Sequence, residues 1–146
     1  MLDRIIKTLS ACILLCVFGY MPNSPEPNQV QSLVSPSGKF VLTVPIEKRQ
    51  ENDTGRRWIV TIHDAKGVLM YRDSTSKFVP MLNVYWKWDS EDRVWLYNSD
   101  DSRIWFWVMD GAEWVKEEWG YRDTKVTKRD VLPPEDLKPP SPKSNK

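Results

Sequence analysis

Polar turns recur at short intervals between residues 35 and 121, and they divide this part of the chain into runs too short for ordinary helices. Ser35-Pro-Ser-Gly38 has proline at the second turn position and glycine at the fourth, and Asp110-Gly111 is a two-residue hairpin signal. The runs between the turns are rich in β-branched and aromatic residues and lack a helical period. The predicted strands are 39–47, 57–63, 68–72, 79–88, 93–97, 103–109 and 113–119. We therefore expect an all-β fold: a single small antiparallel meander of about seven strands, arranged as a β-sandwich or a strongly bent sheet.

Two groups of strands are expected to pack face to face. Side chains two residues apart in a strand share a face. The first strands place Phe40, Leu42, Val44 and Ile46 on one face, and Trp58, Val60 and Ile62 on one face. We expect these residues to cover an aliphatic face of the later strands.

The N-terminal segment has the pattern of an export signal. Arg4 and Lys7 precede an apolar run from Leu9 to Phe18, which is short for a membrane-spanning helix. Residues 1–21 are therefore predicted to be a signal peptide or a hydrophobic helix that anchors the chain in a membrane. Leu9-Ser-Ala-Cys12 also resembles a bacterial lipoprotein box, which makes Cys12 a lipidation candidate. The protein is expected to be exported, to the periplasm or the cell surface, or to be membrane-anchored.

Composition shifts mark the remaining boundaries. Residues 22–34 are rich in Pro, Asn, Ser and Gln and are predicted to be a linker, which leaves 35–121 as the β-domain. Both cysteines precede that domain, so packing alone must stabilise it. Residues 122–146 carry five prolines and a net charge of +3, from 7 basic and 4 acidic residues, and are predicted to be a disordered tail.

A five-residue pattern in the middle of the domain recurs ten residues further along the chain. Arg93-Val-Trp-Leu-Tyr97 is repeated as Arg103-Ile-Trp-Phe-Trp107. With the Ser-Pro-x-Gly-Lys turn at 35–39 and the acidic turns, this pattern resembles single blades of the β-propellers of exported bacterial proteins. Ser37 stands where such blades usually have aspartate, and 87 residues amount to about two blades, too few to close a ring. The resemblance therefore implies a β-meander and not a propeller.

The eight tryptophans are the most unusual feature of the composition. A five-residue loop at 98–102 would pair Tyr97 with Arg103, and would bring aromatic rings and cations to one face of the sheet. That face would carry Tyr85, Lys87, Arg93, Trp95, Tyr97, Arg103, Trp105, Trp107, Trp114 and Lys116. The opposite face would carry the aliphatic core: Val84, Trp86, Val94, Leu96, Ile104, Phe106, Val108 and Val115.

The mixed face has two interpretations. As a ligand platform it would stack on sugars or on apolar side chains of a partner, while arginine donates to carboxylates or phosphates. The predicted ligand-binding residues are Arg93, Trp95, Tyr97, Arg103, Trp105, Trp107 and Trp114. Alternatively, a second sheet covers this face, and then the platform hypothesis fails. The expected function is that of a non-catalytic envelope protein that binds a glycan or a protein.

The sequence shows little catalytic chemistry. His63 is the only histidine, and neither a metal site nor a cofactor motif is expected. The net charge of +1 gives no reason to expect a nucleic-acid partner. The alternative function is that of a small envelope hydrolase using carboxylates that the meander groups in its turns: Asp64, Asp89, Glu91, Asp92 and Asp110.

Overall fold

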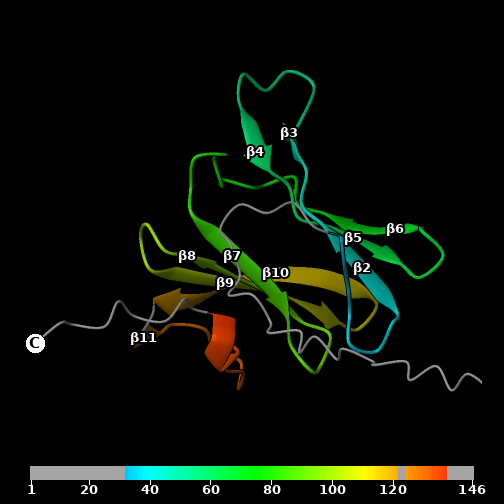
Figure 1. The fold of residues 1–146 in the computed structure, drawn as a ribbon, viewed down its shortest axis with the longest axis vertical. Helices are drawn as coiled ribbons and strands as arrows, with labels where there is room; N and C mark the ends of the chain where they lie inside the picture. The colour runs from blue at the N-terminus through cyan, green and yellow to red at the C-terminus, as the bar shows by residue number, and fades with distance from the viewer. Residues whose placement is uncertain (1–31, 122–123, 138–146) are drawn as a thin grey trace, which may run out of the picture.

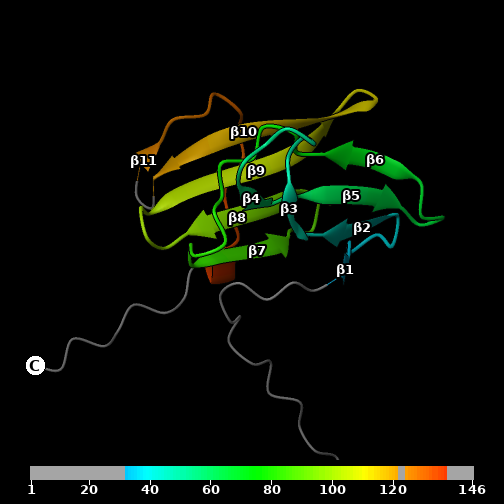
Figure 2. The ribbon, with the colours of Figure 1, turned by 90° about the horizontal axis from the view of Figure 1, so that it is seen from above.

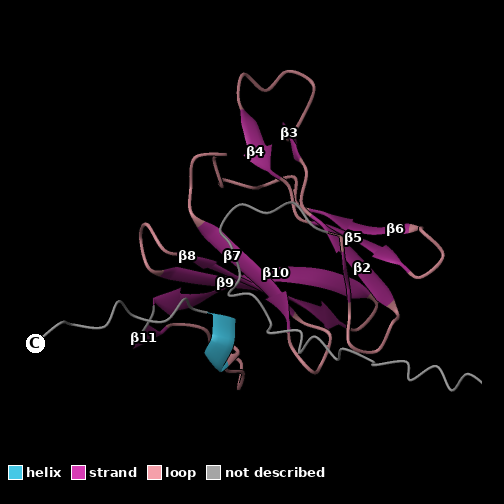
Figure 3. Ribbon diagram, viewed as in Figure 1, coloured by secondary structure: helices cyan, strands magenta, loops and turns pink. Residues whose placement is uncertain are grey.

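The computed structural model describes residues 32–121 and 124–137, and its regular elements are antiparallel strands and one short helical turn (Figures 1 and 3). Four strands form a sheet in the order β1 (Leu33–Val34), β2 (Phe40–Thr43), β5 (Thr61–Asp64) and β6 (Leu69–Arg72). Five form a second sheet in the order β11 (Thr124–Lys125), β10 (Glu113–Tyr121), β9 (Arg103–Asp110), β8 (Val94–Asn98) and β7 (Val84–Trp88). The remaining elements are the hairpin β3 (Ile46–Lys48) and β4 (Arg56–Trp58), and the 3-10 turn η1 (Glu135–Leu137). The all-β antiparallel expectation is confirmed.

Proline splits one long hairpin into two parts. The pairs Thr43–Thr61 and Ile46–Trp58 belong to the same register, but pairing is interrupted at Pro45. Proline has no N–H to donate to a ladder, although the Pro45 carbonyl still accepts a bond from Ile59 N at 2.9 Å. The predicted strands 39–47 and 57–63 are therefore each divided in two. Beyond the break, β3 and β4 project away from both sheets (Figure 1).

The two sheets pack on each other through a core rich in tryptophan, as expected of a β-sandwich. The four-stranded sheet contributes Leu42 and Ile62, and the five-stranded sheet contributes Leu96 and Trp107, all fully buried. Trp114 meets Phe40 edge to face, with ring centroids 5.2 Å apart, and so joins the sheets. Figure 2 shows the strands of each sheet side by side.

A second core lies on the other face of the five-stranded sheet. Its buried members are Trp95, Tyr97, Ile104, Phe106, Trp119 and Leu137. The covering layer comes from residues 124–137: Leu137 is 1% exposed, and the indole of Trp119 donates to the Val131 carbonyl at 3.0 Å. For these residues the expectation of a disordered tail is wrong, because isolated apolar side chains in this Pro-rich stretch have a hydrophobic face to cover.

The predicted pairing of the two central strands is wrong by one residue. Asn98, not Tyr97, pairs with Arg103, so the loop has four residues. Ser102 adopts a φ of 63° in this loop, a conformation that non-glycine residues seldom take. Since neighbouring residues in a strand face opposite ways, the shift moves one strand of the pair to the other face.

The predicted signal or anchor (1–21) and most of the predicted linker (22–34) lie outside the described residues. Within 32–121 and 124–137, no helix is long and apolar enough to cross a membrane.

Candidate functional site

The predicted aromatic platform is divided between the two faces of the five-stranded sheet. Trp95 and Tyr97 face the layer formed by residues 124–137, where they are 0% and 3% exposed. Trp107 and Trp114 face the four-stranded sheet, where they are 0% and 7% exposed, and Trp105 is half-buried against the same core. The shared face predicted for these rings is therefore wrong, and the four buried rings are covered by the protein itself.

The two predicted arginines have separate partners. Arg103 places its guanidinium carbon 5.5 Å from the ring centre of Tyr121, with Asp101 at 3.6 Å. Arg93, whose side chain is 15% exposed, donates from Nε to Asp89 at 2.6 Å and lies 3.0 Å from Glu91. The structure places Cys12, the lipidation candidate, outside the described residues.

Asp89 organises the turn between β7 and β8. Its Oδ2 accepts from Arg93 and, at 2.7 Å, from the indole of Trp95, and its Oδ1 accepts the backbone N–H groups of Glu91 and Arg93. Burial acts to raise the pKa of Asp89, but these hydrogen bonds outweigh burial and hold the pKa below its ordinary value. The carboxylate thus remains charged and fixes the Arg93 side chain.

A cleft of about 310 Å³ opens beside this turn, where the β7–β8 hairpin meets residues 132–136. Lys87 and Asp136, which form an ion pair with each other, line the cleft together with Arg93 and Asp89. Leu132, which is 71% exposed, also lines the cleft. Of the predicted ligand-binding residues, Arg93 is the one that lines this cleft.

A buried ion pair ties the two sheets together at another place. Lys116 on β10 donates to Asp73, just after β6, at 2.7 Å; the Asp73 side chain is 0% exposed and that of Lys116 is 13% exposed. The Lys116 ammonium also lies 4.9 Å from the ring centre of Phe78 and 5.2 Å from that of Trp105. Burial, together with the charge of Asp73, raises the pKa of Tyr71 nearby to about 12.

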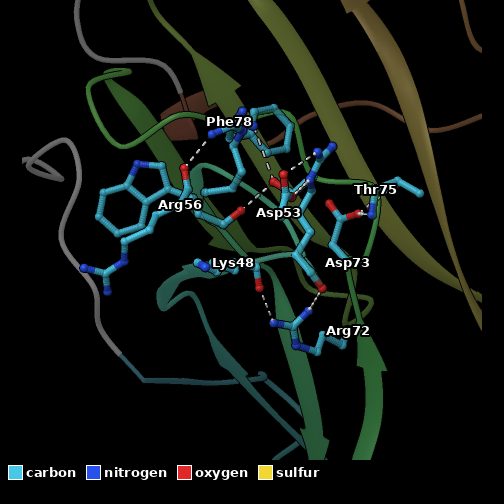
Figure 4. Close-up of polar contacts among 11 residues, drawn as sticks. Lys48, Asp53, Arg56, Arg72, Asp73, Thr75 and Phe78 are labelled. Carbon is cyan, nitrogen blue, oxygen red and sulfur yellow. Dashed lines mark hydrogen bonds and ion pairs between the residues drawn. The ribbon is translucent and has the colours of Figure 1, made fainter. Parts of the chain in front are cut away.

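Polar contacts fix the base of the projecting hairpin. Figure 4 shows Arg72 directed at the backbone near Lys48, to whose carbonyl it donates at 3.0 Å, while Asp73 accepts from Thr75. Arg72 also pairs with Glu47 at 2.8 Å. These contacts hold β3 to the four-stranded sheet.

The turn carboxylates expected of a hydrolase are engaged in holding turns. Asp64 accepts the backbone N–H groups of Lys66 and Val68, both at 2.8 Å. Asp92 accepts from the backbone of Ser37, and Asp110 lies 2.6 Å from Arg129. Across the described ranges, no three His, Cys, Asp or Glu side chains are grouped to hold a metal ion.

Sequence reasoning missed the cleft residues contributed by the C-terminal stretch 132–136, because that stretch has no strand or helix periodicity. These residues are Leu132, Pro134 and Asp136. Trp119 offered a weak signal, as a large ring near the strand end that needs a cover. No protein-family model matches the chain, and neither a curated protein nor a solved structure is found to be similar to it.

Proposed function

We propose that this chain is a non-catalytic, exported protein that is tethered to a membrane by its N-terminal segment and binds a protein partner at the cleft beside Arg93. The tether is the expectation drawn from the apolar run at residues 9–18. The binding role has its support in the cleft itself.

The single observation that carries the proposal is the cleft itself, in which Arg93, held by Asp89, lies beside the exposed Leu132. Protein interfaces combine an apolar centre with a polar rim and are rich in arginine. Here Leu132 and Pro134 supply the apolar part, and Lys87, Arg93 and Asp136 supply the rim. The Asp89 contacts hold Arg93 in one orientation, so a partner would meet a preorganised side chain.

A protein partner fits the tryptophans better than a glycan does. Sugar stacking requires an accessible ring face. Six of the eight tryptophans are at most 7% exposed, and Trp86 and Trp105 pack against the core between the sheets. A hydrolase has less support, because the turn carboxylates already accept hydrogen bonds or pair with cations.

Site-specific photo-crosslinking in the envelope tests the proposal. A photo-reactive phenylalanine analogue replaces Leu132 in one variant of the full chain, and Met81, which is 82% exposed, in the matched control. We expect a discrete crosslinked protein from position 132 and none from position 81. Lys87→Ala should reduce the yield of that product. Equal products at both positions, no product at 132, or a product that glycosidases digest away would contradict the proposal.

A further inference from the structure

We propose that the outer face of the four-stranded sheet lies against the surface of an anionic lipid bilayer. The inference rests on the membrane tether of the proposed function but not on the cleft. It concerns a surface on the other sheet.

Strand register places one row of three apolar side chains and a histidine across the whole of this sheet. Val34 pairs with Val41, Val41 with His63, and His63 with Leu69, so the four side chains form one row over β1, β2, β5 and β6. The neighbouring row of Leu33, Leu42, Ile62 and Tyr71 points into the sandwich core. By alternation, Val34, Val41 and His63 face outward. A register shift between Ile62 and His63 places Leu69 opposite His63, and so on the outward face, although core-facing Tyr71 is only two residues further on.

This face is open at its two edges within the described part of the chain, while Val41 and His63 between them are half-buried. Val34 is 63% exposed and Leu69 is 53% exposed, while Val68 and Met70 beside Leu69 are 56% and 41% exposed. Eight large apolar side chains of the described residues are exposed; Val68, Leu69 and Met70 cluster at the start of β6, and Val34 lies on β1 at the opposite edge of the sheet. Clustered exposed apolar residues mark a contact surface, whereas scattered ones need no explanation.

Two lysines flank the row at one end of the sheet. Lys39 immediately precedes β2 and Lys66 lies in the β5–β6 turn; the pairing of Phe40 with Asp64 places both at the same end. Both are exposed, and neither forms an ion pair with any residue that the structure describes. Asp64, the carboxylate between them, uses Oδ1 to accept two backbone N–H groups. Apolar side chains bordered by lysines are typical of surfaces that bind anionic bilayers.

The predicted tether joins the described part of the chain at β1, the strand that carries Val34. The described residues begin at Ser32, next to β1, whose Val34 is the first member of the row. The predicted membrane segment ends at Phe18, and the 13 residues between can span at most about 45 Å. A tether of this length keeps the sheet at a high effective concentration near the bilayer, so a weak patch suffices.

The size of the patch favours a bilayer over a second copy of the chain. Four strands spaced about 4.8 Å apart make a row about 20 Å long and one residue wide. Such a row offers far less than the roughly 800 Å² per partner that stable protein interfaces bury. A bilayer surface sets no such minimum.

Lipid quenching in proteoliposomes tests the inference. An azido-phenylalanine introduced at Leu69, or at Met81 as the control, carries an environment-sensitive dye, so that Cys12 and Cys16 remain unmodified. The full chain is reconstituted in phosphatidylcholine vesicles with or without phosphatidylglycerol, and headgroup spin-labelled lipid is the quencher. We expect quenching at position 69 to exceed that at position 81 by at least about two-fold, and to increase with phosphatidylglycerol. Lys39→Gln combined with Lys66→Gln should remove that increase.

Equal quenching at the two positions would overturn the inference. Shielding of the dye at position 69 from the quencher that appears only at a high protein-to-lipid ratio would overturn the inference in favour of self-association. Carbonate extraction of the unlabelled chain separates the two proposals. A chain that washes off the vesicles refutes the tether and this inference with it, whereas a retained chain with an unquenched position 69 refutes only the inference.

Discussion

The buried pair Asp73–Lys116 should couple the two sheets strongly. Lys116→Met removes the cation but keeps most of the apolar stem. Among the described residues, the N–H and hydroxyl of Thr75 are then the remaining partners of a carboxylate that is 0% exposed. Breaking one side of a buried pair costs about 3–5 kcal/mol. Because the Lys116 side chain retains 13% exposure, we expect the low end, near 3 kcal/mol, including the lost contacts with Phe78 and Trp105.

Removing both charges should cost less than the sum of the two single changes. In Asp73→Asn with Lys116→Met no unpaired charge is buried, so we expect a coupling free energy of about 2 kcal/mol. Urea unfolding of the full chain, followed by tryptophan fluorescence, measures all three variants. The matched control is Lys87→Met, whose ion pair with Asp136 is 44% and 69% exposed and should contribute less than about 1 kcal/mol. Additive single changes, or a Lys116→Met cost no larger than that of the control, would refute the reasoning.

Three further changes test other parts of the fold. Leu137→Ala should destabilise the protein by about 2–4 kcal/mol in urea unfolding, because it leaves a cavity in the second core. Leu132→Ala, at a 71% exposed position, should change the stability by less than about 0.5 kcal/mol. Equal effects would mean that residues 124–137 do not pack on the sheet. Gly120→Ala should lower the stability by at least about 3 kcal/mol, since φ is +140° and the new Cβ would lie 2.1 Å from a backbone oxygen of β11. Gly111→Ala, with φ +63° and open space around it, should lower the stability by about 1 kcal/mol. The reverse order in thermal melts would contradict this. The folded-state pKa of Asp89 lies below its unfolded value, so the contribution of Asp89 to folding stability is present above about pH 4 and is lost as pH falls through the folded pKa. Asp89→Asn should therefore flatten the acid limb of the stability–pH curve. An unchanged limb would count against the Asp89 network.

The strands were predictable because turn chemistry is local. The Asp and Gly turns mark where chain direction reverses, and each predicted strand overlaps a strand of the structure. Within the β7–β8 and β9–β10 hairpins, the predicted faces are also right: Tyr85 lies with Tyr97, and Trp107 with Lys116.

The join between those hairpins was not predictable from hydrophobicity. Both faces of the five-stranded sheet are buried, so Trp95 and Leu96 are equally suited to either core. An apolar pattern fixes register only where one face meets water. The register is fixed by the left-handed backbone at Ser102. No glycine stands at this position to indicate that conformation in the sequence. The cleft was missed for a related reason, because its second wall comes from a segment with no periodic pattern.

The second core has a consequence for the order of folding. Trp95 and Phe106 stack with centroids 5.0 Å apart, yet the leucine that covers them lies more than thirty residues further along the chain. During synthesis, the meander can be complete while this aromatic surface is still open to water. In a partly synthesised chain, this aggregation-prone surface is therefore the last to be covered. Any truncation before residue 137 should leave it permanently exposed.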